Sequence, residues 1–368
     1  MIKQRYAANY QRARVAVDLF AGGGGLTLGL KQAGFLVSAA VEIDKEATNT
    51  YVANHPGTVM FQRDIRLISG AELTRTSPTN SIDLIAACPP CQGFSQLTAK
   101  YRRSDPRDEL IFEFIRLVSE IRPTMLMMEN VAGLATKGAE LFTSAMNQLK
   151  SFGYQLSFEV LDVANYGVPQ RRRRLVVLGA RGFPIALPHA THARVAGQQL
   201  KRWVTVRDTI SKMNKPIRLP KARDTKDITH LHWHVVRNLS QLSLQRLRAT
   251  SAGTQRAVLP HSLRPKCHQD TDSGFSNVYG RMSWDNPAPT ITGGCTTLSK
   301  GRFGHPSLLR TISVREAALL QSFPTNYIFD TKYIDHACNI IGNALPPRFA
   351  RIMASACRTA IEDKYDNQ

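Results

Sequence analysis

Short apolar runs, each followed by small or polar residues, recur through the first half of the chain. The run 15–20 (VAVDLF) predicts a buried strand, and the glycine-rich segment 21–25 (AGGGG) follows it directly. Residues 26–31 begin a helix that Gly34 closes, and a second apolar run occupies 35–41. This order of strand, glycine turn, helix and strand predicts two parallel strands joined by a right-handed crossover.

Two further apolar runs, 82–88 and 125–128, have the same form. Between them, apolar residues at helical spacing over 110–118 predict a helix, and residues 105–106 (DP) provide its start signal. The chain is therefore expected to form an α/β fold built on a parallel sheet. Further candidates are a strand at 175–179 and helices at 313–320 and after Pro347.

Polar or small residues follow each of the predicted strands. They include Gly22, Glu42, Cys91 and Glu129. Ligands of open parallel sheets bind beyond the carboxyl ends of the strands. We therefore expect these four residues on one rim of the sheet.

The positive charge of the chain is concentrated in one stretch. The 368 residues include 48 Lys and Arg against 28 Asp and Glu, which gives a net charge of +20. Residues 181–280 hold 17 Lys and Arg, 5 Asp and no Glu, a net charge of +12. Such an excess favours a polyanionic partner, either nucleic acid or an anionic membrane surface. Because helix and strand patterns are weak there, this stretch is predicted to form a second, smaller domain that contacts the polyanion.

Features of membrane and secreted proteins are absent from the sequence. No apolar run approaches the roughly 18 residues that span a bilayer. The first residues, MIKQRYAANYQRARV, lack the apolar stretch of a signal peptide. Six cysteines in a chain of this length do not form a disulfide framework. We expect a soluble, cytoplasmic protein.

The glycine turn differs from the dinucleotide-binding fingerprint. That fingerprint needs glycines at positions n, n+2 and n+5, but Gly22 and Gly24 are followed by Thr27. A nucleoside cofactor without a pyrophosphate also needs a tight turn, with an acid about 20 residues later for the ribose. Glu42 stands at that offset, and Asp64 is a candidate for the adenine edge. A purely structural glycine turn is the alternative.

The segment 89–95 (PPCQGFS) offers three interpretations for its cysteine. Cys88 and Cys91 have the spacing of a redox or zinc pair, but no second CxxC pair accompanies them. A buried, inert cysteine is the common alternative. A nucleophile at a strand end is the third, and it needs an electrophile and a charged partner.

Glu129 and the run 170–174 (QRRRR) are candidates for those partners. A carboxyl group that shares a proton with a pyrimidine N3 makes C6 more electrophilic; a helix-capping acid is the alternative. In an extended run, Gln170, Arg172 and Arg174 share one face, and the intervening arginines share the other. One face is expected to lower the pKa of the thiol and the other to hold phosphate, whereas a solvated basic patch is the alternative.

Three histidines alternate at His230, His232 and His234. On a strand they would share a face and resemble a metal site, but no carboxylate or cysteine stands beside them. A basic strand that faces DNA is the favoured interpretation, and no metal site is expected.

Five motifs in this order resemble those of the C5-cytosine-specific DNA methyltransferases, and the similarity runs from residue 15 to about residue 355. The motifs are DLFAG at 18–22, PPCQGFS at 89–95, ENV at 129–131, QRRRR at 170–174 and GNALPP at 342–347. The segment 315–324 (REAALLQSFP) also resembles the family's stretch before its last motif. The compact length is similar to that of bacterial restriction-modification enzymes.

The resemblance implies a fold and a reaction. The fold is a Rossmann-like methyltransferase sheet with helices on both faces, plus a smaller target-recognition domain. Cys91 adds to C6 of a flipped-out cytosine, Glu129 contacts N3 and the exocyclic amine, and Arg172 and Arg174 stabilise the base. Methyl transfer from S-adenosylmethionine to C5, loss of the C5 proton and elimination of Cys91 complete the cycle.

The resemblance also implies binding residues and partners. The partners are double-stranded DNA and a cognate restriction endonuclease that acts on the same site without direct contact; no membrane is involved, and a monomer is expected. The catalytic domain would span 1–188 and 337–368, and the recognition domain 189–336. The expected cofactor-binding residues are Phe20, Gly22, Gly24, Gly25, Glu42, Ile43, Asp64, Ile65, Pro89, Leu110, Asn343 and Ala344, and the expected nucleic-acid-binding residues are Gln92, Ser95, Arg171, Arg173, Arg281, Thr290 and Arg302.

The sequence departs from the family pattern at one point. The family commonly has glycines before Pro-Pro-Cys, whereas Ala87 and Cys88 stand there in this chain. We expect Cys88 to be dispensable. The alternatives are a transfer-RNA cytosine methyltransferase, although the Cys-Phe-Thr tripeptide typical of those enzymes does not occur, and a catalytically silent DNA-binding relative.

Overall fold

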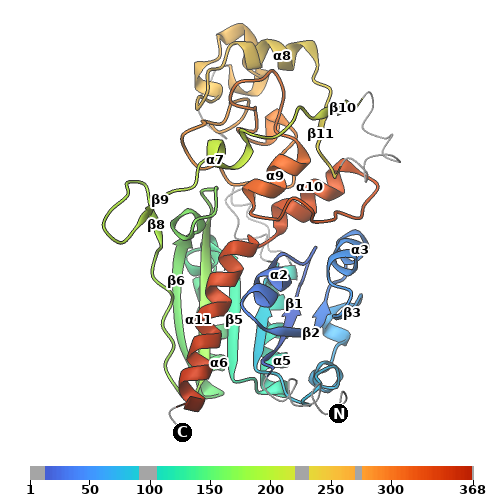
Figure 1. Cartoon of the computed structure of the whole chain (residues 1–368), viewed down its shortest axis with the longest axis vertical. Helices are drawn as coiled ribbons and strands as arrows, with labels where there is room; N and C mark the ends of the chain where they lie inside the picture. Colours follow the sequence, from blue (N-terminus) through green and yellow to red (C-terminus); the bar gives the residue numbers. More distant parts are fainter. Residues whose placement is uncertain (1–12, 91–105, 220–231, 270–275, 367–368) are drawn as a thin grey trace. The chain divides into compact units, whose positions relative to one another are not determined.

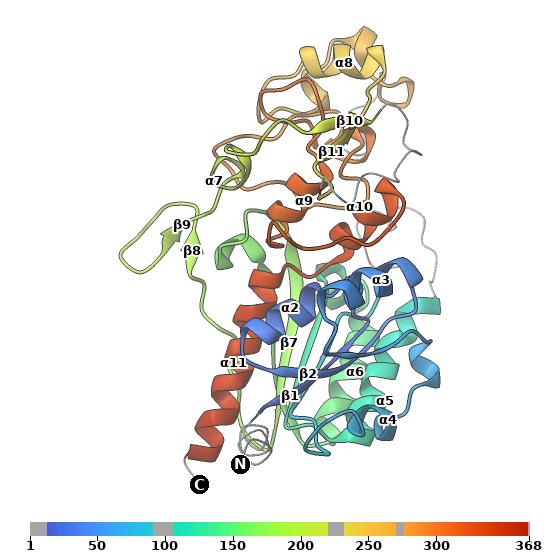
Figure 2. The same cartoon turned by 45° about the vertical axis from the view of Figure 1, so that its right-hand side comes forward.

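The computed structural model describes residues 13–90, 106–219, 232–269 and 276–366 (Figures 1 and 2). The chain falls into two compact units. The first runs over Met1–Val163, Arg173–Ala190 and Leu345–Gln368, and the second over Ala164–Arg172 and Thr191–Ala344. Compactness thus places residues 337–344 in the second unit, whereas the sequence analysis assigned them to the catalytic domain.

A seven-stranded sheet forms the centre of the first unit, in the order β3-β2-β1-β4-β5-β7-β6. Neighbouring strands from β3 to β5 pair in parallel, and β7 is antiparallel to both β5 and β6. The strands are β1 Val15–Leu19, β2 Leu36–Val41, β3 Val59–Phe61, β4 Leu84–Ala87, β5 Met125–Val131, β6 Tyr154–Asp162 and β7 Arg173–Arg181.

Helices cover both faces of this sheet. Figures 1 and 2 show α2 and α11 on one face and α5 and α6 on the other. Gly29 allows α11 to pack closely on α2, because a Cβ at this position would lie 2.5 Å from the Cβ of Ala350. The helices of the unit are α2 Gly25–Gln32, α3 Lys45–Asn54, α4 Gly70–Thr74, α5 Ile111–Ile121, α6 Ala139–Ser151 and α11 Pro347–Asp366.

The predicted Rossmann-like α/β sheet is confirmed. All five apolar runs form strands, and the pattern at 110–118 forms α5 with a preceding 3-10 turn, Pro106–Leu110. Two strands of this sheet were not predicted. β3 has only three residues, and β6, at the edge of the sheet, alternates apolar and polar residues rather than forming a continuous apolar run.

The second unit has short elements and long connections. Its strands form two small two-stranded sheets. The predicted helix at 313–320 begins at Val314, because the Ser313 side chain and Glu316 make a reciprocal capping box. The elements are β8 His192–Ala193, β9 Lys201–Arg202, α7 Val206–Ile210, β10 Ile217–Leu219, β11 Val235–Arg237, α8 Gln241–Arg248, α9 Val314–Leu320 and α10 Ile334–Asn343. Across the described ranges of both units, no helix has the length and apolar character to cross a membrane.

Candidate active site

The chain turns sharply between β1 and α2. Phe20, Gly22 and Gly24 have φ angles of 59°, 53° and 87°, a region that glycine adopts readily and phenylalanine rarely does. Glu42, directly after β2, spans this turn: its Oε2 accepts a hydrogen bond from Gly22 N at 2.8 Å, and its Oε1 accepts from Ile43 N at 2.8 Å. Burial raises the pKa of the Glu42 carboxyl, although these backbone donors oppose the shift. The structure therefore brings Gly22 and Glu42 together.

Two buried polar contacts stabilise the residues on either side of this turn and within it. Asp18 is fully buried in β1, and its Oδ2 accepts a hydrogen bond from Thr27 Oγ1 of α2 at 2.7 Å. Burial raises the pKa of Asp18 from 3.8 to about 7, against the lowering effect of the Thr27 hydrogen bonds. His55 Nε2 contacts the carbonyl of Gly24 at 3.2 Å. The sequence analysis did not single out Asp18 or His55; an acid inside an apolar run is the signal that marks Asp18.

The remaining predicted cofactor residues have different surroundings. Ile43 is 64% exposed beside Glu42. Asp64 follows β3 and pairs with Arg66 at 2.5 Å, while Ile65 is buried in the core of the sheet. Leu110 ends the 3-10 turn before α5 and packs against that core.

Glu129, in β5, forms an ion pair with Arg174 of β7. The distance from Arg174 Nε to Glu129 Oε1 is 2.6 Å, and the side chains are 15% and 10% exposed, respectively. The direction of β7 explains the contact. Because β7 is antiparallel to β5, its first residues lie beside the last residues of β5, with Arg174 opposite Val131. Burial lowers the pKa of the Arg174 guanidinium, and the charge of Glu129 opposes this effect.

The chain before Cys91 is tied to the same strand end. Asn130 Nδ2 donates a hydrogen bond to the carbonyl of Pro89 at 3.2 Å. The sequence analysis named Asn130 only as part of a motif, and its position next to Glu129 was the available signal. Cys91, Gln92 and Ser95 lie outside the described residues.

Cys88 lies near two acids at the end of β4. Burial raises the pKa of its thiol well above the ordinary value, and the charges of Glu129 and Asp18, with a hydrogen bond to Glu129, add to this shift. A thiol in such surroundings stays protonated at neutral pH, and the thiolate is the nucleophilic form. This environment disfavours Cys88 as a nucleophile.

The first three residues of the run 170–174 belong to the second unit, and the last two belong to the first unit. Gln170 and Arg172 are buried whereas Arg171 is exposed, and this alternation is that of the predicted extended run. Arg172 Nη1 donates hydrogen bonds to the carbonyls of Ile291 and Gly342, both at 3.0 Å. Arg172 therefore joins two segments of the second unit that lie far apart in the sequence.

The other predicted residues of the second unit and of β7 are placed as follows. The Arg281 guanidinium donates hydrogen bonds to the carbonyls of Leu247, Thr250, His305 and Leu308, which hold it within the fold of this unit. Its contact with nucleic acid stays a prediction. Arg302 Nη1 donates a hydrogen bond to the carbonyl of Gly253 at 3.1 Å, and Thr290 Oγ1 donates to the carbonyl of Arg171 at 2.8 Å. Arg173 is exposed on β7. Asn343 is the last residue of α10, and Ala344 is its C-cap.

Two separate chemistries are consistent with the geometry of the first unit. A glycine turn spanned by a buried carboxylate suits the sugar of a nucleoside. A carboxylate held by an arginine at a strand end suits proton exchange with a ring nitrogen. Among the described residues, no three His, Cys, Asp or Glu side chains gather into a cluster that could hold a metal ion.

Comparison with known proteins identifies the family. The sequence model of the C-5 cytosine-specific DNA methylases matches residues 15–359. The Type II methylase M.HgiDII of Herpetosiphon aurantiacus is 34% identical, over 96% of this chain and 97% of its own length. The Type II methyltransferase M1.HphI of Haemophilus parahaemolyticus is also 34% identical, over 92% and 85%, respectively.

Solved structures agree with this result. A putative DNA modification methyltransferase encoded within an E. coli prophage superposes with a TM-score of 0.69 at 25% identity, covering 95% of this chain and all of that one. Spodoptera frugiperda DNMT2 shares the fold, with a TM-score of 0.61 at 17% identity over 94% of this chain and all of that one. The chain therefore belongs to the C-5 cytosine-specific DNA methylases of the restriction-modification type, and it is a DNA cytosine-5 methyltransferase.

Proposed function

We propose that this enzyme transfers the methyl group of S-adenosylmethionine to C5 of a cytosine flipped out of duplex DNA, through a covalent bond between Cys91 and C6. The Glu129–Arg174 ion pair at the end of β5 carries the proposal. Asn130, the next residue of that strand, holds the carbonyl of Pro89, two residues before Cys91 in the sequence. The strand that carries the carboxylate thus also fixes the segment that leads to the thiol.

The β1–α2 turn fits S-adenosylmethionine. Glu42 lies across the turn from Gly22, where a carboxylate suits the hydroxyls of a ribose. Exposed Ile43 offers an apolar surface to an adenine ring. A Cβ built on Gly22 would meet nothing within 4 Å, so the turn borders open space. When bound, S-adenosylmethionine supplies an electrophilic methyl group.

The side chains of the chain itself account for the remaining steps. Cys91 Sγ, as a thiolate, forms a bond to C6, and Glu129 shares a proton with N3, which makes C6 more electrophilic. Arg174 Nε holds Glu129 Oε1, so that the carboxylate meets the base in one orientation. Once C5 carries the methyl group, it loses its proton, and elimination of Cys91 Sγ restores the aromatic ring. Arg172 is proposed to stabilise the base beside the thiolate.

The second unit is proposed to bind the duplex DNA substrate. Residues 181–280 carry a net charge of +12, which suits the phosphate backbone. We assign target recognition to this part of the chain, as the sequence analysis did for 189–336. A cognate restriction endonuclease that acts on the same site, a monomeric enzyme and a cytoplasmic location complete the proposal.

The test is transfer of a labelled methyl group to duplex DNA and to transfer RNA by the wild type and by Cys91→Ser. We expect label in DNA from the wild type and none from the variant. A duplex whose cytosines carry fluorine at C5 should trap a covalent complex, because C5 then has no proton to lose. Cys91→Ser should trap none, and Cys88→Ala is the matched control that should still trap it. Label in RNA alone, or unchanged label with Cys91→Ser, would overturn the proposal.

A further inference from the structure

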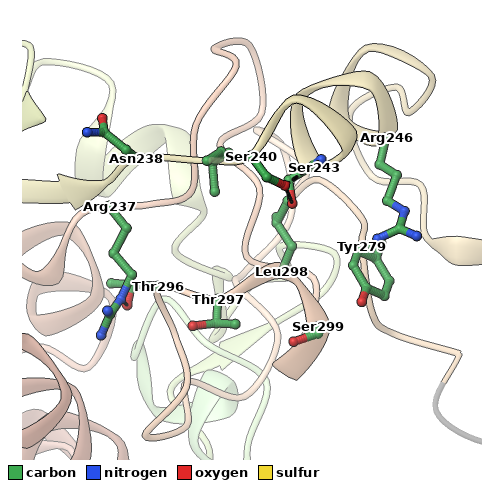
Figure 3. A pocket seen from close by; sticks show the side chains of 11 residues that line it. Arg237, Asn238, Ser240, Ser243, Arg246, Tyr279, Thr296, Thr297, Leu298 and Ser299 are labelled. Atoms are coloured by element: carbon green, nitrogen blue, oxygen red, sulfur yellow. Dashed lines mark hydrogen bonds between the residues drawn. The ribbon is translucent and has the colours of Figure 1, made fainter. Parts of the chain in front are cut away.

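A pocket of about 230 Å³ lies in the second unit, between α8 and the segment 296–299. Figure 3 shows Arg246 and Tyr279 on one side of the pocket, Arg237 and Thr296 on the other, and Thr297 and Ser299 between them. None of the described residues that line it carries a carboxylate, and their hydroxyl groups and guanidinium groups can all donate hydrogen bonds.

The two arginines of the pocket differ in how their charge is used. Arg237 is paired with Asp335 and donates through Nε to Thr296 Oγ1 at 3.2 Å, so its charge is compensated within the fold. Arg246 has no acidic partner in the described part of the chain. Its Nε donates to the carbonyl of Leu263 at 2.7 Å, and its guanidinium lies 4.5 Å from the centre of the Tyr279 ring.

These contacts hold the Arg246 guanidinium in place but leave its outer edge available. The two terminal nitrogens, Nη1 and Nη2, make no hydrogen bond to any residue that the structure describes, and the same is true of the hydroxyls of Thr297 and Ser299. A braced guanidinium whose terminal nitrogens are open matches the oxygen atoms of a phosphate group. The site is therefore built for an anion with several acceptor oxygens.

We propose that this pocket binds one backbone phosphate of the DNA substrate and so positions the duplex; the inference rests on the proposed function. The concave shape favours a phosphate over a base. Base edges lie at the bottom of a groove about 8.5 Å deep and are read by elements that protrude, whereas phosphates project from the duplex. Arg246 is the anchor of this site.

The experiment uses a duplex in which the wild-type enzyme methylates a cytosine, found by sequencing modified DNA. Binding is measured against salt concentration for the wild type, Arg246→Gln, Thr297→Val and Arg248→Gln. Arg248 is the matched control because it is exposed on the same helix but does not line the pocket. Loss of one phosphate contact should lower the slope of log K against log salt by about 0.9 and weaken binding roughly eightfold near 0.1 M salt. Thr297→Val changes another part of the pocket without removing a charge and should leave the slope unchanged.

Neutral methylphosphonates placed singly along the duplex locate the contact. One position should weaken binding by the wild type and by Arg248→Gln, but leave Arg246→Gln unaffected. The inference is overturned if Arg246→Gln keeps the same sensitivity at every position, if it changes sequence preference rather than affinity, or if inorganic phosphate binds the pocket while DNA binding is unchanged. Methylation of the duplex by the wild type is established first, so a failure of the proposed function is seen separately.

Discussion

Replacing Asp18 by asparagine should stabilise the protein more at pH 8 than at pH 5. Asp18 is fully buried, and burial raises its pKa from 3.8 to about 7. Between about pH 4 and pH 7 the folded protein therefore keeps a proton on Asp18 that the unfolded chain has released. Stability from this group is complete below the unfolded pKa and is lost as the pH rises through the folded pKa. The free energy of unfolding should thus fall across this window and level off above it.

The magnitude follows from the shift. One pKa unit corresponds to about 1.4 kcal/mol, so the full rise from 3.8 to about 7 amounts to at most about 4 kcal/mol. The part of the window between pH 5 and pH 7 amounts to about 3 kcal/mol. Asparagine keeps a side-chain oxygen for Thr27 Oγ1 and does not ionise. The advantage of Asp18→Asn over the wild type should therefore grow by up to about 3 kcal/mol from pH 5 to pH 8.

Guanidinium unfolding of both proteins at the two pH values gives the four free energies required. Their double difference cancels the groups that titrate alike in both proteins. Asp363→Asn removes one negative charge at an exposed position of α11 and should give a double difference near zero. A folded Asp18→Asn protein with a double difference below about 0.5 kcal/mol would refute the reasoning.

Three further substitutions test other parts of the first and second units. Cys88→Ala should keep most of the methyl transfer to duplex DNA, because the high pKa of this thiol disfavours it as a nucleophile; a folded but inactive variant in the labelled-methyl assay would contradict this. Arg174→Ala should lower the free energy of unfolding by roughly 3 kcal/mol, since it leaves the Glu129 carboxylate without its partner, and a urea titration showing a loss under about 1 kcal/mol would argue against a desolvated pair. Gly342→Ala should lower the free energy of unfolding by roughly 2 kcal/mol, because the new Cβ would lie 2.3 Å from facing backbone atoms. Gly57→Ala is the control, since a Cβ there meets nothing within 4 Å. Equal decreases in Tm for the two variants would contradict this prediction.

The central strands could be predicted because they are buried and therefore apolar along most of their length. The runs that became β1, β2, β4 and β5 are mainly apolar segments with strand-end residues at one edge of the sheet. β6 is an edge strand, and its sequence YQLSFEVLD alternates apolar and polar residues from Tyr154 to Val160. Such alternation also indicates a strand, but the sequence analysis relied on continuous apolar runs and so missed it.

The site was predictable where it depends on spacing along the chain and obscure where it depends on strand direction. Glu42 was found from its offset to Gly22, and the two are hydrogen-bonded. The Glu129–Arg174 pair depends on β7 running antiparallel to β5. If β7 ran parallel to β5, its first residues, including Arg174, would lie beside the start of β5 and far from Glu129. No local pattern encodes that direction. Charge alone also does not distinguish an exposed arginine from Arg281, whose guanidinium donates hydrogen bonds to carbonyl groups inside the fold.

The packing of α11 on α2 bears on how the protein is synthesised. Arg358 of α11 donates a hydrogen bond to the carbonyl of Ala33, which lies 325 residues earlier in the chain. At roughly 5 to 20 residues per second, a ribosome needs about 15 to 65 seconds to make the intervening residues. During that time the face of α2 that carries Gly29 has no partner helix, and the polypeptide of the second unit emerges first. The first unit is therefore completed only after translation of the second unit, and until then the face of α2 that packs against α11 is not covered by that helix.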